Sequence, residues 1–301
     1  MFGSIRRFRD WMIAPALNEL HAAKEALTTQ LEQHAAQIEC QLFDFLRDQP
    51  ASLLSAGLNA RSARLRAEAG AALPVFKPPM HLPFEESLRR LEALNPPLYT
   101  VWRALFEHGS KSYVEERLGS CSHRDHTYAQ LFGAYIEIYG HGRILDIGYG
   151  PYRLPTYLST RNPAMVCGVE PLEMLETPVF EVLRGFNEFL PWGDEEFDTV
   201  VSGTSLDHVM SLEVSLQEVQ RVLRPDGKYI VWLASIPGSA PFDEQAKNFE
   251  PVDNFHLFHF DRAWIEPFFE RYFKIDDAMI ISQPGFEHVF YCMTPRKLLS
   301  F

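Results

Sequence analysis

The sequence predicts an α/β fold in which a doubly wound, Rossmann-like sheet follows an α-helical N-terminal region. From Gly142 onward, short apolar runs of strand type alternate with helical patterns, which is typical of parallel strand pairing. A glycine turn, Gly148-Tyr149-Gly150, directly follows the first apolar run. Residues 1–70 have helical character throughout and contain no proline between Pro15 and Pro50. Together these observations divide the chain into a helical part and a sheet-forming part.

The composition is that of a globular protein with an acidic surface. Of the 301 residues, 46% are hydrophobic, and the formal net charge is -12. Because nucleic-acid backbones attract basic surfaces, we expect no nucleic-acid partner. Four scattered cysteines indicate reduced thiols and no disulfide framework. With no recognisable signal peptide and no apolar run of membrane-spanning length, we expect a cytoplasmic protein.

Residues 1–70 are expected to form a long helix with coiled-coil character. A seam with a 3.5-residue repeat runs from Ile13 to Phe45 and is apolar at seven of its ten positions. Such a stripe is buried either in a homodimer or against the chain's own domain, and both arrangements stay open. Residues 1–12 form a basic amphipathic segment that suits peripheral contact with an anionic membrane. The alternative is a frayed helix start with a solvated basic face.

The middle of the chain is expected to be a linker followed by a helical layer. Four prolines mark residues 71–84 as a stiff linker. Residues 85–141 are expected to form several short helices that serve as a lid or a substrate-side layer. Within them, Cys121–His126 gathers a cysteine, two histidines and an aspartate, but the spacing matches no standard zinc pair. With no second ligand cluster evident, we predict no metal site.

Residues 142–301 are expected to form the sheet and its covering helices. Helices are expected after the glycine turn, from Pro171, over 214–222 and over 261–270, where Asp261 is the cap. The proline and the Asp-Gly pair in 224–227 favour a turn before the fifth strand. The expected strands cover 143–147, 165–169, 179–184, 197–201 and 228–233, followed by an antiparallel pair at 272–281 and 288–293.

The stretch from Arg143 to Pro151 is the pattern around which a nucleotide-like ligand is expected to bind. Gly148 and Gly150 allow a sharp turn and a close approach of backbone to ligand at the end of a parallel strand. A dinucleotide fingerprint needs a third glycine where Arg153 stands, which argues against NAD. A phosphate loop needs a Gly-Lys-Ser/Thr ending, which is also missing here.

An acid ends the second expected strand. Glu170 follows Gly168-Val169, at the position from which a carboxylate can accept hydrogen bonds from both hydroxyls of a cofactor ribose. This position is compatible with a nucleoside-containing cofactor.

Four separated motifs occur in order at 144–151, 168–170, 190–198 and 218–227. Together they resemble the class I S-adenosylmethionine-dependent methyltransferases, closest to the small-molecule and glycan-modifying branch. The resemblance covers about half of the chain. It implies a seven-stranded sheet with its last strand antiparallel, and S-adenosylmethionine as the cofactor in the crevice at the strand ends.

The sequence departs from the family pattern at two positions. Tyr152 stands where a third glycine is common. Phe186 or Asn187 stands where an aspartate often contacts the adenine amino group, and an asparagine can still hydrogen-bond the adenine edge. The cofactor-binding residues that the resemblance implies are Asp146, Gly148 and Gly150 for the methionine end, Glu170 for the ribose, and Pro171, Leu172 and Asn187 for the adenine.

The candidate catalytic residues lie after the fourth and fifth expected strands. His208, with Asp207 beside it, follows the fourth strand, where the family places substrate-facing residues. An alcohol acceptor benefits from such a general base, although His208 as a helix-orienting residue is the alternative. His256 and His259 alternate with phenylalanines that could stack on a sugar face, or that form core under a surface loop.

These residues favour an O-methyltransferase acting on a saccharide or another small hydroxyl compound. Methylation of nitrogen or of a carboxylate needs no strong base and is the alternative within the same class. An inactive methyltransferase-like scaffold that recruits partners through its N-terminal helix is the alternative from another class.

Overall fold

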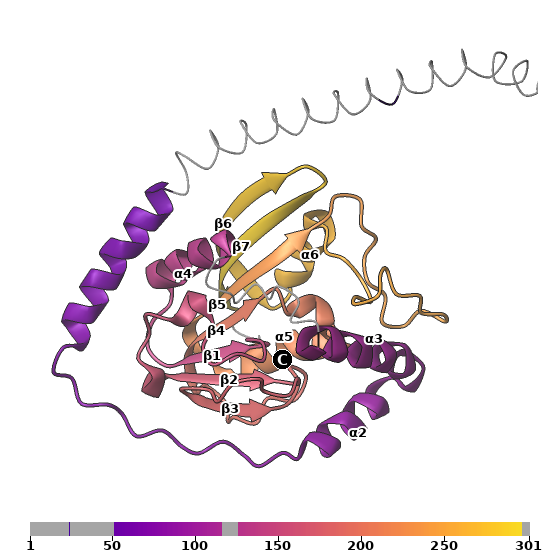
Figure 1. The fold of residues 1–301 in the computed structure, drawn as a ribbon, viewed down its shortest axis with the longest axis horizontal. Coiled ribbons are helices and arrows are strands. Elements are labelled where there is room, and N and C mark those ends of the chain that lie inside the picture. The colour runs from indigo at the N-terminus through magenta and orange to yellow at the C-terminus, as the bar shows by residue number, and fades with distance from the viewer. Residues whose placement is uncertain (1–23, 25–50, 116–125, 297–301) are drawn as a thin grey trace, which may run out of the picture. The chain divides into compact units, whose positions relative to one another are not determined.

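The computed structural model describes residue 24, residues 51–115 and residues 126–296 (Figure 1). The chain divides into two units, Met1–Ser52 and Leu53–Phe301, and the elements below belong to the second, apart from residues 51 and 52 at the start of the first helix. The predicted segment 1–12, the helical seam apart from Lys24, and Cys121 with its neighbours up to residue 125 lie outside the described residues. None of the described helices combines the length and the apolar character needed to cross a membrane.

A seven-stranded sheet forms the centre of the described fold, in the order β3-β2-β1-β4-β5-β7-β6. The first five strands pair in parallel, and β7 lies antiparallel between β5 and β6. The predicted fold class, including the antiparallel last strand, is confirmed. The strands are β1 Ile144–Ile147, β2 Val166–Glu170, β3 Glu181–Arg184, β4 Phe197–Gly203, β5 Leu223–Ser235, β6 Phe273–Gln283 and β7 Phe286–Pro295.

Helices precede the sheet and connect its later strands. Residues 51–68 are helical, and residues 71–83 have no regular structure. The predicted cap of the last helix is confirmed, because the Asp261 side chain accepts a hydrogen bond from the Ala263 amide at 2.9 Å. The α-helices are α2 Phe84–Leu94, α3 Pro96–Glu115, α4 Thr127–Tyr139, α5 Leu212–Val222 and α6 Arg262–Phe269; the short 3-10 helices are η1 Thr156–Leu158, η2 Pro163–Met165 and η3 Leu206–His208.

Two predicted helices are absent from the described sheet connections. The glycine turn leads to the short 3-10 helices η1 and η2 but to no α-helix, and residues 171–180 between β2 and β3 contain no helix. The two connections bond to each other instead, since the Leu175 amide donates to the Pro151 carbonyl at 2.8 Å and the Val179 amide to the Arg153 carbonyl at 3.3 Å. These bonds satisfy backbone groups that a helix would otherwise pair internally.

The predicted turn at 224–227 lies inside β5 as an irregularity. Phe197 pairs with Leu223, whereas Thr199 pairs with Lys228, so β5 has extra residues opposite Asp198. A proline cannot donate to a strand ladder, which explains why regular pairing resumes only at Lys228. The prediction of a turn before the strand was therefore wrong, because residues 224–227 lie within β5. They do interrupt the pairing of β5 with β4.

Hydrophobic clusters lie on both faces of the sheet. Leu145 and Ile147 belong to the cluster that includes residues of α3, α5 and α6, whereas Ile144 belongs to the cluster that includes α4. This division follows from the alternation of side chains along a strand. On the α4 side, the Phe132 ring lies 5.6 Å from Trp232 and 5.3 Å from Phe290, centroid to centroid.

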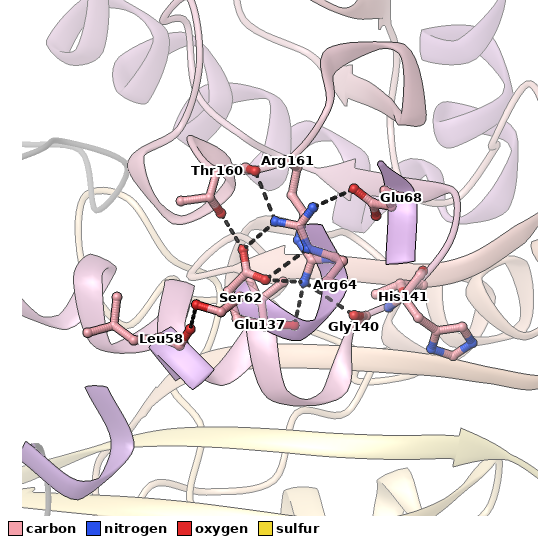
Figure 2. A network of polar contacts seen from close by, with 11 residues as sticks. Leu58, Ser62, Arg64, Glu68, Glu137, Gly140, His141, Thr160 and Arg161 are labelled. Atoms are coloured by element: carbon pink, nitrogen blue, oxygen red, sulfur yellow. Dashed lines mark hydrogen bonds and ion pairs between the residues drawn. The ribbon is translucent and has the colours of Figure 1, made fainter. Parts of the chain in front are cut away.

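A polar network joins the helix of residues 51–68 to α4 (Figure 2). Arg64 contacts Glu137 through two nitrogens, each 3.1 Å from a different carboxylate oxygen. Arg64 also donates to the Thr160 carbonyl at 3.0 Å, and Arg161 lies 3.4 Å from Glu137. A Cβ at Gly57 would lie 2.7 Å from the Ala134 Cβ, so the absence of a side chain lets the two helices approach closely. These contacts attach the part of this helix from Gly57 to Arg64 to α4.

Candidate functional site

A cavity lies at the carboxyl ends of β1, β2 and β4, where the strand order reverses direction. In open α/β sheets, ligands bind in the crevice at such a switch point. Residues of α3 form another part of its wall. The lining residues are Trp102, Leu105, Phe106, Gly109, Ser110, Tyr113, Ile147, Gly148, Gly150, Pro151, Val169, Glu170, Pro171, Leu172, Gly185, Phe186, Asn187, Glu188, Gly203, Thr204, Ser205, Asp207, His208, Val209, Phe255 and Leu257.

The turn after β1 requires its glycines. Gly148 and Gly150 have φ angles of 71° and 86°, in the left-handed region. A Cβ at Gly148 would lie 2.4 Å from the Ser205 Cβ, which is too close for any side chain. Ser205 is itself fixed, because its hydroxyl donates to the Ile147 carbonyl at 2.6 Å. The end of β1 and the loop after β4 therefore form one rigid wall of the cavity.

Glu170 ends β2 and faces the cavity beside this turn. Its Oε2 accepts a hydrogen bond from the Gly150 amide at 2.7 Å, and its Oε1 accepts one from the Leu172 amide at 3.0 Å. Burial raises the pKa of Glu170 to about 7, although the two backbone hydrogen bonds oppose the increase. The carboxylate is fixed in position and retains lone pairs for further donors.

Asn187 follows β3 and lines the same cavity. Both its Nδ2 and its Oδ1 are buried and have no hydrogen-bond partner among the described residues. An unsatisfied buried polar group costs about 1–3 kcal/mol of stability. Phe186, the other residue at the position implied by the resemblance, packs against Trp102 at 5.3 Å between ring centroids. Asn187 is therefore the polar group that this position offers to a ligand.

Asp146 is placed differently from the other predicted cofactor residues. It is fully buried within β1 and is not among the residues that line the cavity. Its Oδ1 accepts a hydrogen bond from the Tyr157 hydroxyl at 3.4 Å, and its Oδ2 has no hydrogen-bond partner in the described part of the chain. Burial raises the pKa of Asp146 well above its ordinary value. The structure thus brings Gly148, Gly150, Glu170, Pro171, Leu172 and Asn187 to the cavity wall, but not Asp146.

His208 and Asp207 also line the cavity, on η3 directly after β4. Burial lowers the pKa of His208, and Asp207 opposes the decrease. A lowered pKa keeps the imidazole neutral near pH 7, where it can accept a proton. Asp207 Oδ1 lies 3.9 Å from His208 Nε2 and has no hydrogen-bond partner among the described residues. The two predicted residues are therefore neighbours at the cavity wall.

His256 and His259 lie behind His208 and are not among the cavity-lining residues of the described chain. The His256 ring stacks on the His208 ring, with 4.7 Å between centroids and 26° between planes. His256 Nδ1 lies 2.9 Å from Asp253 Oδ2, and His259 Nε2 lies 3.4 Å from the same oxygen. Phe255, from the same loop, does reach the cavity.

Sequence reasoning missed two features of the wall. Glu188 is buried beside Asn187, and its Oε1 accepts hydrogen bonds from the amides of Met210 at 2.7 Å and Ser211 at 3.2 Å. Burial raises its pKa to about 7. Trp102 and Phe106 on α3 stack at 5.3 Å between centroids. An acid between Phe186 and Phe189 was a signal for Glu188. The helix pattern could not show which side of α3 faces a cavity.

One protein family matches the segment that contains the strands at the cavity. Residues 145–231 match the family described as "Methyltransferase domain". This segment runs from β1 to the middle of β5 and contains most of the cavity wall outside α3. The match agrees with the predicted resemblance to methyltransferases over these residues.

Proteins with known sequences or structures are similar to parts of this chain. The uncharacterized protein YafE of Escherichia coli (strain K12) is 40% identical over 55 residues, which are 18% of this chain and 27% of that protein. The PH0226 protein from Pyrococcus horikoshii OT3 is 17% identical, with a TM-score of 0.44 over 62% of this chain and 96% of its own.

A third similar protein is the 1,6-didemethyltoxoflavin-N1-methyltransferase of Burkholderia thailandensis, whose structure includes 1,6-didemethyltoxoflavin and S-adenosylhomocysteine. It is 14% identical, with a TM-score of 0.46 over 73% of this chain and 94% of its own. This chain thus spans about a quarter of the curated relative that it matches and nearly all of these two solved chains.

Proposed function

We propose that this protein is an S-adenosylmethionine-dependent methyltransferase that methylates a hydroxyl group of a saccharide or another small molecule. The observation that carries the proposal is the pairing of Glu170 with Asn187 in one cavity of a methyltransferase domain. Glu170 offers a fixed acceptor, and Asn187 offers an unsatisfied donor and acceptor. A nucleoside presents the complementary groups, namely two ribose hydroxyls and a hydrogen-bonding base edge.

The cofactor would lie across the strand ends. Glu170 would accept hydrogen bonds from the ribose hydroxyls, and Asn187 would bond the adenine edge. Pro171 and Leu172, which follow Glu170 at the wall, would pack against the adenine ring. The turn at Gly148 would admit the methionine end without a side-chain clash. When bound, the cofactor supplies an electrophilic methyl group.

His208 would receive the proton that the acceptor hydroxyl loses as the oxygen takes the methyl group. It lines the cavity in the loop that follows β4, the strand next to β1. Asp207 would stabilise the charged imidazole that forms, since it is the carboxylate next to His208. Trp102 and Phe255 give the cavity aromatic surfaces of the kind that stack on sugar rings.

One observation favours an amine as a second candidate acceptor. Glu188 and Asp207 place carboxylates in a cavity that is also lined by Trp102 and Phe106. Acids and aromatic rings together attract cations, and such a site would suit methylation of a nitrogen. Methylation of a carboxylate has no such support, because the added negative charge would meet these acids. The inactive scaffold remains the alternative outside the enzyme class.

We further propose that the protein works in the cytoplasm on a small-molecule acceptor. Cys167 and Cys292 are free thiols buried in the described fold, as expected for a reducing compartment. The cavity is enclosed by side chains of α3 and the strand-end loops, which suits a small acceptor better than a polymer.

Calorimetric titration with S-adenosylmethionine and S-adenosylhomocysteine tests the proposal. We expect saturable binding of each at one site per chain, followed by methyl transfer to hydroxyl compounds in a screen that begins with sugars and includes amines. A correctly folded protein that binds neither compound would support the scaffold and contradict the enzyme. Transfer to amines alone would support the second candidate.

A further inference from the structure

Asp253, His256 and His259 form a compact set on the loop between β5 and α6. Their potential ligand atoms, one from each residue, all lie within 4.8 Å of one another. The side chains of His256 and His259 are 22% and 27% exposed, and that of Asp253 is 38% exposed. The set lies outside the lining of the cavity described above. From the sequence we predict no metal site, and the cluster weighed there is the one at residues 121–126.

The two distances from Asp253 to the histidines are close to those of a tetrahedral metal site. Asp253 Oδ2 lies 2.9 Å from His256 Nδ1 and 3.4 Å from His259 Nε2. Ligands at the Zn–N and Zn–O distances of about 2.0–2.1 Å are separated by about 3.3 Å along a tetrahedral edge. An ion between the three atoms would therefore require only small side-chain movements.

The groups around the set hold the ligands in place. Asp253 Oδ1 accepts hydrogen bonds from the amides of Phe255 at 2.7 Å and His256 at 2.8 Å, which fixes the carboxylate. The other ring nitrogen of His256 lies 3.7 Å from Asp207 Oδ2. Histidines that bind metals usually donate their second ring N–H to a carboxylate, and this contact sets the tautomer. Asp207 is therefore the nearest carboxylate for this role, and the two atoms would have to approach by about 0.7 Å to form the hydrogen bond.

We propose that Asp253, His256 and His259 bind a divalent transition-metal ion, with Zn²⁺ as the best fit. Two imidazoles and one carboxylate form a donor set of the kind that suits zinc, whereas Mg²⁺ and Ca²⁺ favour oxygen ligands. The set leaves at least one position for water. Because the His256 ring stacks on His208, the ion would also fix the ring behind the candidate base. The proposal stands apart from the methyltransferase function.

The test is a calorimetric titration of the tag-free, chelator-treated full chain with ZnCl₂, without cofactor. We expect one tight site, with a dissociation constant in the micromolar range or below. His259→Ala and Asp253→Asn should each weaken it at least tenfold. His141→Ala, which removes an exposed histidine elsewhere, should leave it unchanged, as should Cys121→Ser in the cluster predicted not to bind metal. Circular dichroism checks that each variant is folded, and His259→Gln replaces His259→Ala if the latter is not.

Cobalt provides a second measurement. Co²⁺ in the site should give visible absorption bands of a four- or five-coordinate ion with nitrogen and oxygen ligands, and His259→Ala should abolish them. The proposal is overturned if no saturable zinc binding occurs. It is also overturned if binding persists in the His259 and Asp253 variants, or if Cys121→Ser removes it. Because none of these readouts uses S-adenosylmethionine, failure here is distinguishable from failure of the proposed function.

Discussion

The carboxylate of Glu170 accepts a hydrogen bond from the Gly150 amide at 2.7 Å, so the acid that ends β2 fixes the turn that follows β1. The same carboxylate also receives the Leu172 amide. A side chain held from two sides is preorganised for a ligand and loses little freedom on binding. The predicted ribose acceptor is therefore also part of the framework that shapes the cavity.

Cofactor affinity should depend on pH through Glu170. Burial raises the pKa of Glu170 to about 7, and the ionised form is the better acceptor for ribose hydroxyls. Affinity for S-adenosylmethionine should therefore increase as the pH rises from 6 to 8, by up to roughly tenfold, because the ionised fraction increases by about that factor. Calorimetry at pH 6, 7 and 8 measures this increase.

Glu170→Gln should flatten the pH dependence, since a glutamine does not titrate. Glu173→Gln is the matched control, because its side chain is 78% exposed and outside the cavity lining. It should keep the pH dependence of the unmodified protein. An unchanged pH profile in Glu170→Gln would assign the titration to another group and remove Glu170 from the ribose site.

His208→Ala should lower turnover of a hydroxyl acceptor by a factor of about 10²–10⁴, the range for loss of a general base. The affinity for S-adenosylmethionine should change less than about threefold, since binding does not need the base. Steady-state kinetics and calorimetry measure the two effects, with His141→Ala as the control. Equal turnover with and without His208 would contradict base catalysis and favour a nitrogen acceptor.

Much of the sheet and the cavity could be predicted from the sequence, because strand-end motifs are local. The apolar runs around Leu145 and Val169 identify β1 and β2, and the parallel arrangement brings their carboxyl ends together. The missing helix at residues 171–180 could not be predicted, since it depends on the hydrogen bond between Leu175 and Pro151 from another connection. Likewise, only the folded chain shows that Asp146 is buried away from the cavity wall.

The Arg64–Glu137 pair should stabilise the attachment of the helix of residues 51–68. Arg64→Met removes two hydrogen bonds to the Glu137 carboxylate and leaves it with Arg161 and Thr160, so it should lower the free energy of unfolding by about 2 kcal/mol. Arg66→Met, which removes an exposed arginine two residues later, should change it by less than about 0.5 kcal/mol. Urea denaturation compares the two variants, and equal stabilities would contradict the role of Arg64.

The same pair should make the protein sensitive to acid. Burial opposes ionisation of Glu137, but hydrogen bonds from Arg64 and Thr160 lower its pKa below the ordinary value. A depressed carboxyl pKa adds stability above the unfolded-state value of about 4.3, and this stability is lost as the pH falls through the folded pKa. Arg64→Met should reduce the loss of stability between pH 5 and pH 3, as measured by thermal unfolding.

The most direct test of the cofactor site compares the unmodified protein with Asn187→Leu by calorimetric titration with S-adenosylmethionine. We expect at least tenfold weaker binding in the variant. We also expect an unchanged or higher melting temperature, because a leucine removes two buried polar atoms that lack partners among the described residues. Equal affinity in the folded variant would show that Asn187 does not contact the cofactor and would contradict the proposed site.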